Sequence, residues 1–221
     1  MLYIISTPIG NLKDITLRAI ETLKGVDFIA CEDTRKTSIL LNHCQIKKPL
    51  LSYYSYNQIK RGEEILRLLN SGKSIALVSD SGTPGISDPG TQLIKLAIEN
   101  NIPLTVIPGP TAFVAALSLS GLPTHKFAFE GFLPKKEGQR KKRLSELSKE
   151  KRTVILYESP YRIKRLLGEI LGLMGDREIA VLRELTKKFE EVKRGLVSGL
   201  ISHFAKVKPR GEFIVVISGG K

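Results

Sequence analysis

The chain has 221 residues, 42% hydrophobic and 26% charged, which is the composition of an ordinary globular protein rather than a disordered one. No apolar run reaches the roughly 20 residues of a membrane span, and the N-terminus lacks a signal-peptide pattern, so we expect a cytoplasmic protein with no membrane partner. Two cysteines and three scattered histidines lack metal-ligand spacing, so we expect neither a metal site nor a disulfide.

The net charge of +13 is unevenly distributed. Residues 1–120 contain 12 Lys+Arg against 10 Asp+Glu, whereas residues 121–221 contain 23 against 12. Such an asymmetry favours a polyanionic partner, with nucleic acid first, an acidic small molecule second and a membrane surface third. A basic surface that only maintains solubility is the plain alternative.

In the first half, short apolar runs alternate with stretches of helical period. The runs predict strands over residues 2–6, 27–31, 50–53, 74–79 and 104–107. Helical spacing of apolar residues occurs at Leu17, Ile20 and Leu23, at Ile65, Leu66 and Leu69, and at Leu93, Leu96 and Ala97. This α/β alternation predicts a mainly parallel sheet with helices on both faces.

A break near residues 120–126 divides the chain, because Gly121 and Pro123 end an alanine-rich helix over residues 111–119. We therefore predict an N-terminal α/β domain over residues 1–120 and a basic C-terminal α/β domain over residues 121–221. The second half shows strand patterns at 127–132, 153–157, 178–184, 189–194 and 212–218, and helix patterns at 138–149, 160–171 and 196–205. The third and fourth of these strands are too close for a helical crossover, which predicts an antiparallel pair in a mixed sheet.

Four loops rich in small and polar residues directly follow predicted strands. They are "TPIGN" (7–11), "CEDTR" (31–35), "SDSGTPGISDPG" (79–90) and "PGPTA" (108–112). Ligands of open α/β sheets bind beyond the carboxyl ends of the strands, so these loops are expected to converge on one pocket. Two known phosphate patterns are absent: "SGKS" at 71–74 lacks the first glycine of a P-loop, and no G-x-G-x-x-G follows the first strand.

Eight segments together resemble one family. They are "TPIGNLKDIT", "CEDTR", "SDSGTPGISDPG", "PGPTA", "FLPKKEGQRKKRL", "YESPYR", "RELTKKFEE" and "RGEFIVVISG". Their order is similar to that in the bacterial small-subunit ribosomal RNA methyltransferases that methylate a cytidine ribose 2′-OH, within the tetrapyrrole methylase superfamily. The resemblance spans nearly the whole chain. It implies two α/β domains, S-adenosylmethionine in a cleft between them, a substrate that is ribosomal RNA or the small ribosomal subunit, and a homodimer.

The resemblance also implies donor-binding residues. In the first domain they are Pro8, Ser81, Gly82, Thr83, Ile86, Thr111 and Ala112, and in the second domain they are Tyr157, Glu158 and Leu185. Within the 79–90 loop, Asp80 and Asp88 are expected to tie the loop and cap the following helix.

A ribose hydroxyl is a weak nucleophile at neutral pH, so a general base would assist the methyl transfer. Carboxylates of the matching motifs are Glu32, Asp33, Glu158, Glu184, Glu190 and Glu191. Our leading hypothesis is that Glu158 or Asp33 orients or deprotonates the hydroxyl. Each carboxylate has an alternative role as the ion-pair partner of Arg35, Arg162 or Arg183.

Residues 135–152 carry nine basic and three acidic residues, which predicts a phosphate-binding surface. Its candidate RNA contacts are Arg140, Lys141, Lys142 and Arg143, to which Arg35 and Arg162 of the matching motifs are added. Leu144 and Leu147 form the packing side of this segment. Tyr53, Tyr54 and Tyr56 are a further candidate for stacking an extruded base, with core or rim packing as the alternative.

Two other functions stay open at this point. A methylase acting on a tetrapyrrole precursor would share the fold, and its many-carboxylate substrate would also favour a basic protein. A non-enzymatic RNA-binding module would account for the charge but not for four pocket-forming loops. Titration with S-adenosylmethionine separates the second alternative from an enzyme.

Overall fold

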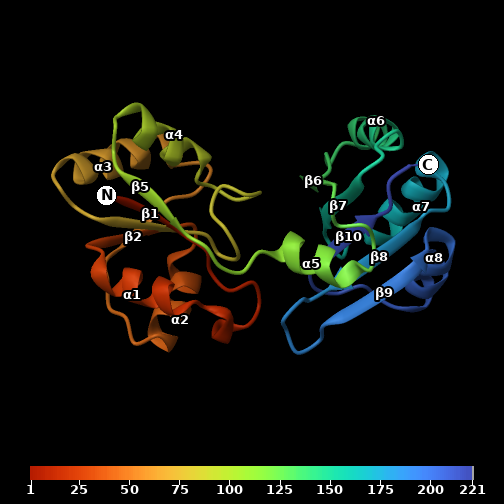
Figure 1. Ribbon diagram of the computed structural model, residues 1–221, viewed down its shortest axis with the longest axis horizontal. Helices are drawn as coiled ribbons and strands as arrows, with labels where there is room; N and C mark the ends of the chain where they lie inside the picture. Colours follow the sequence, from red (N-terminus) through yellow and green to blue (C-terminus); the bar gives the residue numbers. More distant parts are fainter. Residues whose placement is uncertain (221) are drawn as a thin grey trace. The chain divides into compact units, whose positions relative to one another are not determined.

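A computed structural model of the chain describes residues 1–220 and divides it into two compact units, Met1–Thr111 and Ala112–Lys221 (Figure 1). The predicted boundary at residue 120 lies after helix α5 (Ala112–Ser120), whereas the units divide before it. The reason is that α5 packs on the strands of the second unit. In addition, Arg194 of that unit donates to the carbonyls of Leu119 and Ser120 at the end of α5.

The first unit is a five-stranded sheet between two pairs of helices (Figure 1). Its strands, all parallel and in the order β3-β2-β4-β1-β5, are β1 (Leu2–Ile5), β2 (Phe28–Cys31), β3 (Leu50–Ser52), β4 (Ile75–Val78) and β5 (Leu104–Ile107). Its helices are α1 (Leu17–Gly25), α2 (Thr34–His43), α3 (Gln58–Asn70) and α4 (Thr91–Glu99), with a short 3₁₀ turn at Leu12–Asp14. The predicted strands and the parallel, doubly covered sheet are confirmed.

Strand β4 shows why both faces are covered. Side chains alternate between the faces of a sheet. Ile75 and Leu77 join the core under α3 and α4, whereas Ala76 and Val78 join the core under α1 and α2. All four are buried, so the strand reads as one continuous apolar run.

The second unit contains a mixed sheet in the order β6-β7-β10-β8-β9. Its strands are β6 (Phe127–Phe132), β7 (Thr153–Glu158), β8 (Glu178–Arg183), β9 (Glu191–Leu196) and β10 (Phe213–Ile217), and its further helices are α6 (Glu137–Leu147), α7 (Ile163–Met174) and α8 (Val197–Lys206). β6 and β7 are parallel, while β10 is antiparallel to both β7 and β8. The predicted antiparallel pair of β8 and β9 is confirmed.

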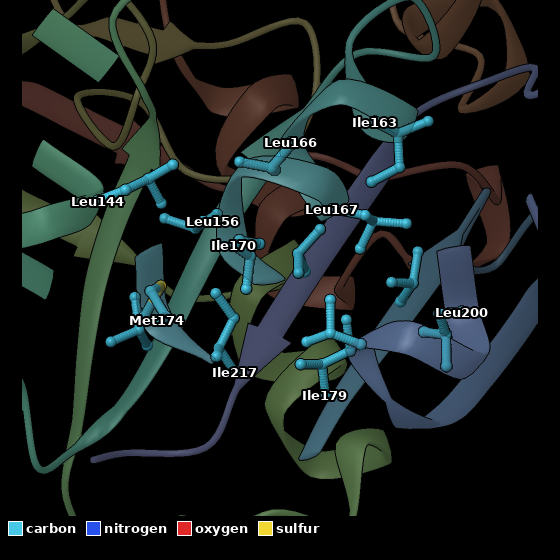
Figure 2. Close-up of a cluster of buried hydrophobic side chains, with 14 of the residues drawn as sticks. Leu144, Leu156, Ile163, Leu166, Leu167, Ile170, Met174, Ile179, Leu200 and Ile217 are labelled. Atoms are coloured by element: carbon cyan, nitrogen blue, oxygen red, sulfur yellow. The ribbon is translucent and has the colours of Figure 1, made fainter. Parts of the chain in front are cut away.

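One large core fills the space between this sheet and three helices. Leu144 of α6, Leu167 and Ile170 of α7 and Leu200 of α8 pack on Leu156 of β7 and its neighbours (Figure 2). Ile155, Leu182 and Val216 alternate with the sheet residues of this core and are also buried. Because α5 contacts the same strands without joining this core, it covers the opposite face.

Candidate functional site

The four predicted loops of the first unit meet at the carboxyl edge of its sheet. Thr7, after β1, exchanges two backbone hydrogen bonds with Gly82, after β4, at N···O distances of 2.9 and 3.1 Å. The hydroxyl of Thr83 lies 2.8 Å from that of Ser6 and 3.2 Å from that of Thr111. The loops after β1, β4 and β5 therefore share one row of neutral hydroxyl groups.

Backbone conformation explains the density of glycines in the 79–90 loop. Gly82, Gly85 and Gly90 all have positive φ, at 80°, 81° and 149°. A Cβ on Gly90 would lie 2.9 Å from the backbone nitrogen of Gly85, so the loop folds back on itself at a point that only glycine permits. Of the predicted donor residues on this loop, Gly82 is buried, whereas Ser81 and Ile86 are exposed.

Of the two roles predicted for the aspartates of this loop, tying the loop and capping α4, only the first is found in the structure. Asp80 does tie loops together, because it accepts from the backbone N–H of Asp33 at 3.1 Å and from Lys36 at 2.8 Å. The predicted cap by Asp88 is wrong, since α4 begins after Gly90 and has no side-chain cap. Burial, assisted by the charges of Glu32 and Asp80, instead raises the pKa of Asp88 to about 6.

The structure thus brings together a charged cluster that the sequence did not predict. Its members are Glu32, Lys36, Asp80 and Asp88. Burial and the charge of Asp80 also raise the pKa of Glu32. Position in the sequence could have indicated the cluster, because Glu32 and Asp80 each lie within two residues of the end of a strand, and these strands, β2 and β4, are neighbours in the sheet. A small cavity of about 60 Å³ adjoins the cluster and is lined by Thr7, Pro8, Leu12, Lys36, Thr37, Leu40, Ser79 and Asp80.

Asp33 is fully engaged by its own helix. Its side chain caps α2 by accepting from the backbone N–H of Arg35 at 2.9 Å, and its two oxygens also bind the Arg35 guanidinium at 3.0 and 2.8 Å. These hydrogen bonds hold the pKa of Asp33 well below its usual range. A carboxylate with so low a pKa is a poor proton acceptor near neutral pH.

In the second unit, cross-strand pairing places the predicted residues at one edge of the sheet. Glu158 of β7 lies opposite Phe213 of β10, which lies opposite Arg183 of β8. Tyr157 and Leu185 therefore lie at this edge with Glu158, whereas Ala112 begins α5. Tyr157 packs edge-on against the rings of Phe129 and Phe132, with centroids 5.1 and 5.5 Å away.

Glu158 is a buried carboxylate with one free oxygen. Its side chain is fully buried, and its Oε1 accepts from the Ser159 backbone N–H and from Arg162, each at 2.7 Å. Its Oε2 has no hydrogen-bond partner among residues 1–220. Both candidate general bases thus pair with the arginines that the sequence offers them, Asp33 with Arg35 and Glu158 with Arg162.

The basic run on α6 separates into one buried and three accessible residues. The Arg140 side chain is only 3% exposed and makes a two-pronged ion pair with Glu169 of α7 at 2.7 and 2.8 Å. It is therefore unavailable to an RNA phosphate in this structure, contrary to its predicted role. Lys141 and Lys142 are exposed, and Arg143 is half-exposed while it pairs with Glu130 and Glu146.

The tyrosine segment also divides. Tyr53 is 1% exposed and belongs to the core, so it cannot stack a base, whereas Tyr56 is 96% exposed.

Cys31 and Cys44 are free thiols. Within residues 1–220, no three His, Cys, Asp or Glu side chains form a metal-binding group, and no helix has the length and apolar character of a membrane span.

Comparison with known proteins shows the family to which the chain belongs and the solved structures that share its fold. The sequence model of the tetrapyrrole (corrin/porphyrin) methylases matches residues 1–201. A cobalt-precorrin-4 methyltransferase superposes with a TM-score of 0.71 at 19% identity, covering 98% of this chain and 94% of that one. A uroporphyrin-III C-methyltransferase from Thermus thermophilus superposes with a TM-score of 0.66 at 21% identity, covering 97% and 93%. These two likenesses concern the fold alone, and with the family match they define a methyltransferase of the tetrapyrrole methylase family.

Relatives with higher sequence identity to this chain show to which family of methyltransferases it belongs. Proteins named ribosomal RNA small subunit methyltransferase I are 51% identical in Thermotoga maritima and 50% identical in Synechocystis. Each alignment covers 99% of this chain, and they cover 98% and 79% of those two proteins. The namesake in Bacillus subtilis is 47% identical over 99% of this chain and 75% of its own length. The chain therefore belongs, within the tetrapyrrole methylases, to the small-subunit ribosomal RNA methyltransferase I family.

Proposed function

We propose that this protein transfers a methyl group from S-adenosylmethionine to the ribose 2′-oxygen of a cytidine in small-subunit ribosomal RNA. The observation that supports an RNA substrate is the near-complete alignment, at 46–51% identity, with several relatives that are named for ribosomal RNA. The +11 balance of residues 121–221 fits a polyanionic substrate. The cytidine and the 2′-oxygen follow from the family resemblance of the sequence motifs.

The carboxyl edge of the first unit fits the methyl donor. S-adenosylmethionine, when bound, supplies an electrophilic methyl group on a sulfonium. The residues that would hold it there are Pro8, Ser81, Gly82, Thr83, Ile86 and Thr111. The neutral hydroxyl row of Ser6, Thr83 and Thr111 offers hydrogen bonds to a polar nucleoside or amino-acid group, and its position is fixed by the paired backbones of Thr7 and Gly82. Tyr157, Glu158, Leu185 and Ala112 stay predictions for the same ligand.

Of the two proposed proton acceptors, Glu158 has the stronger case. Both oxygens of Asp33 are occupied by Arg35, which leaves Asp33 as a cap that fixes the start of α2. Glu158 keeps an enclosed Oε2 without a donor, a costly arrangement that a substrate hydroxyl would relieve. We propose that Glu158 orients or receives the proton of the ribose hydroxyl, with the Ser159–Arg162 turn shifting to admit it.

Single-turnover methylation of the Glu158→Gln and Asp33→Asn proteins tests this assignment. The Glu158→Gln protein is expected to react at least about 100-fold more slowly, with a changed pH profile, because general-base assistance is worth about 10² to 10⁴ in rate. The Asp33→Asn protein is expected to keep most of its rate and to lose thermal stability. A wild-type rate and pH profile in the Glu158→Gln protein would remove Glu158 from the mechanism.

The substrate is tested with small ribosomal subunits that lack the modification. Incubation with labelled methyl donor, followed by mapping of the label, is expected to place it on a cytidine 2′-oxygen. Label on a base would overturn the proposed position of transfer. Label on an added tetrapyrrole but not on RNA would favour the alternative substrate, and absence of any heat on titration with S-adenosylmethionine would favour a binding module.

A further inference from the structure

Two aromatic side chains are strongly exposed at the carboxyl edge of the second sheet. Phe132, the last residue of β6, is 56% exposed, and Tyr161, three residues after β7, is 95% exposed. Exposed rings gathered at one edge of a sheet are informative because exposed apolar patches mark binding sites, whereas single exposed apolar residues are normal. They lie on neighbouring elements, since β6 and β7 are parallel strands that pair through Phe132 and Tyr157.

Cations accompany both rings. Lys135 and Lys136 follow Phe132 and are exposed, and Lys164 is exposed in the first turn of α7, three residues after Tyr161. We call these five residues, Phe132, Lys135, Lys136, Tyr161 and Lys164, the β6–β7 edge. None of the three lysines has an ion-pair partner among residues 1–220, in contrast to Lys141 and Arg143 on α6.

The backbone that carries these side chains is held in place. The buried Arg140 donates to the carbonyl of Lys135 at 2.9 Å while it pairs with Glu169 of α7. Arg165 of α7 forms an ion pair with Glu137 at the start of α6. The loop after β6 is therefore tied to α7 from both sides, and the ring of Phe132 is set against that of Tyr157.

We propose that the β6–β7 edge binds a single-stranded segment of the RNA substrate, with bases stacked on Tyr161 and Phe132 and phosphates beside Lys135, Lys136 and Lys164. Alternation of exposed rings with unpaired cations is the arrangement that binds unpaired nucleotides, because every base offers a face for stacking and every linkage a negative charge. The inference rests on the proposed RNA substrate and assigns the contact to this edge, in addition to the basic residues of α6.

Binding of the full-length chain to a fluorescent, unstructured RNA of about 12 nucleotides tests the proposal by anisotropy at several salt concentrations. Tyr161→Leu is expected to weaken binding about 10-fold, whereas Tyr161→Phe, which keeps the ring, is expected to bind as wild type does. Because Tyr161 is 95% exposed, neither change should alter the thermal unfolding curve.

The charge contribution has a matched control within the same unit. Lys135→Gln with Lys136→Gln is expected to reduce the slope of log affinity against log salt by about 1.4, at about 0.7 per single-strand phosphate. Lys206→Gln with Lys208→Gln removes the same charge from exposed lysines at the end of α8, outside residues 135–152, and is expected to leave the slope unchanged. Equal effects of the two pairs would indicate diffuse attraction and overturn the assignment.

The outcomes also separate this inference from the proposed function. Undiminished RNA binding by Tyr161→Leu, in a chain that methylates small subunits, would overturn the β6–β7 edge alone. A wild-type chain that binds no RNA and methylates none would overturn the proposed function together with the edge. Weaker RNA binding by Tyr161→Leu with unchanged heat on titration with S-adenosylmethionine supports the edge as an RNA contact distinct from donor binding.

Discussion

The carboxyl edges of the two sheets are built from different chemistry. In the first unit the edge is made of glycines and neutral hydroxyls whose loops bond to one another, as Thr7 does with Gly82 and Ser6 with Thr83. In the second unit the edge has an ion pair between the buried Glu158 and Arg162, together with exposed rings and lysines. A close-fitted backbone suits one small rigid ligand, whereas unpaired cations and exposed rings suit a flexible polyanion. The same position in an α/β sheet thus carries two different sets of side chains, determined by the residues that follow its strands.

The largest effect is expected where the second unit buries charge. Arg140→Met should lower the free energy of unfolding by about 4 kcal/mol, because Glu169, only 9% exposed, loses its two-pronged partner and keeps a single contact with the half-exposed Arg165. The Lys135 carbonyl also loses its donor. Lys142→Met, two residues away on the exposed side of α6, should change it by less than about 0.5 kcal/mol. Urea unfolding measures both. Equal and small losses would show that the Arg140–Glu169 pair supports neither the second unit nor the loop after β6 that carries the lysines of its edge.

The next effect tests whether the first edge depends on close backbone fit. Gly90→Ala should cost about 3 kcal/mol, because φ is +149° and the new Cβ would lie 2.9 Å from the Gly85 nitrogen. Gly72→Ala also has positive φ but meets no atom within 4 Å, so it should cost only about 1 kcal/mol. Thermal unfolding compares them, and titration with S-adenosylmethionine shows whether Gly90→Ala also weakens donor binding. Identical losses in the two variants would mean that φ alone, and not the folded-back loop, sets the cost.

Sequence periodicity was enough to predict the sheets but not every side-chain role. The strands read clearly because β4 and its neighbours are apolar on both faces and are followed by turn residues. The residues of α2 show no clear helical period of apolar side chains, because only Thr37, Leu40 and Leu41 are buried in this helix. The placement of α5 depends on long-range contacts and on Arg194, and local pattern contains neither.

The two site residues that differ from prediction do so for identifiable reasons. Arg140 precedes Leu144 by four residues and Leu147 by seven, so helical phase puts it on the buried side of α6, a signal that the surrounding run of basic residues obscures. Asp88 stands at a usual capping distance from a helix, yet Gly90 occupies the N-cap position of α4. The actual environment of Asp88 arises from Glu32 and Asp80 on other parts of the edge, which only the fold brings together.

The smallest effect concerns the charged cluster beside the first edge and has a definite pH dependence. The pKa of Asp88 is raised from 3.8 to about 6, so the folded protein binds more protons than the unfolded chain between these values, and stability falls as pH rises through them. An asparagine at this position would carry no charge at any pH. Asp88→Asn should therefore give no gain near pH 4 and a gain of about 1 kcal/mol above pH 6, after allowance for partial exposure.

Asp176 in the second unit supplies a control of opposite sign. Hydrogen bonds from the Ser198 backbone N–H and hydroxyl, at 2.9 and 2.7 Å, lower its pKa. Its contribution to stability is present at neutral pH and is lost as pH falls, so Asp176→Asn should destabilise the protein at pH 7 and less so in acid. Thermal unfolding of both variants between pH 2 and 8 measures the contrast, because the Asp176 carboxylate loses its contribution only below its ordinary pKa of 3.8. A pH-independent difference for Asp88→Asn would show that burial does not raise the pKa of its carboxyl in the folded protein.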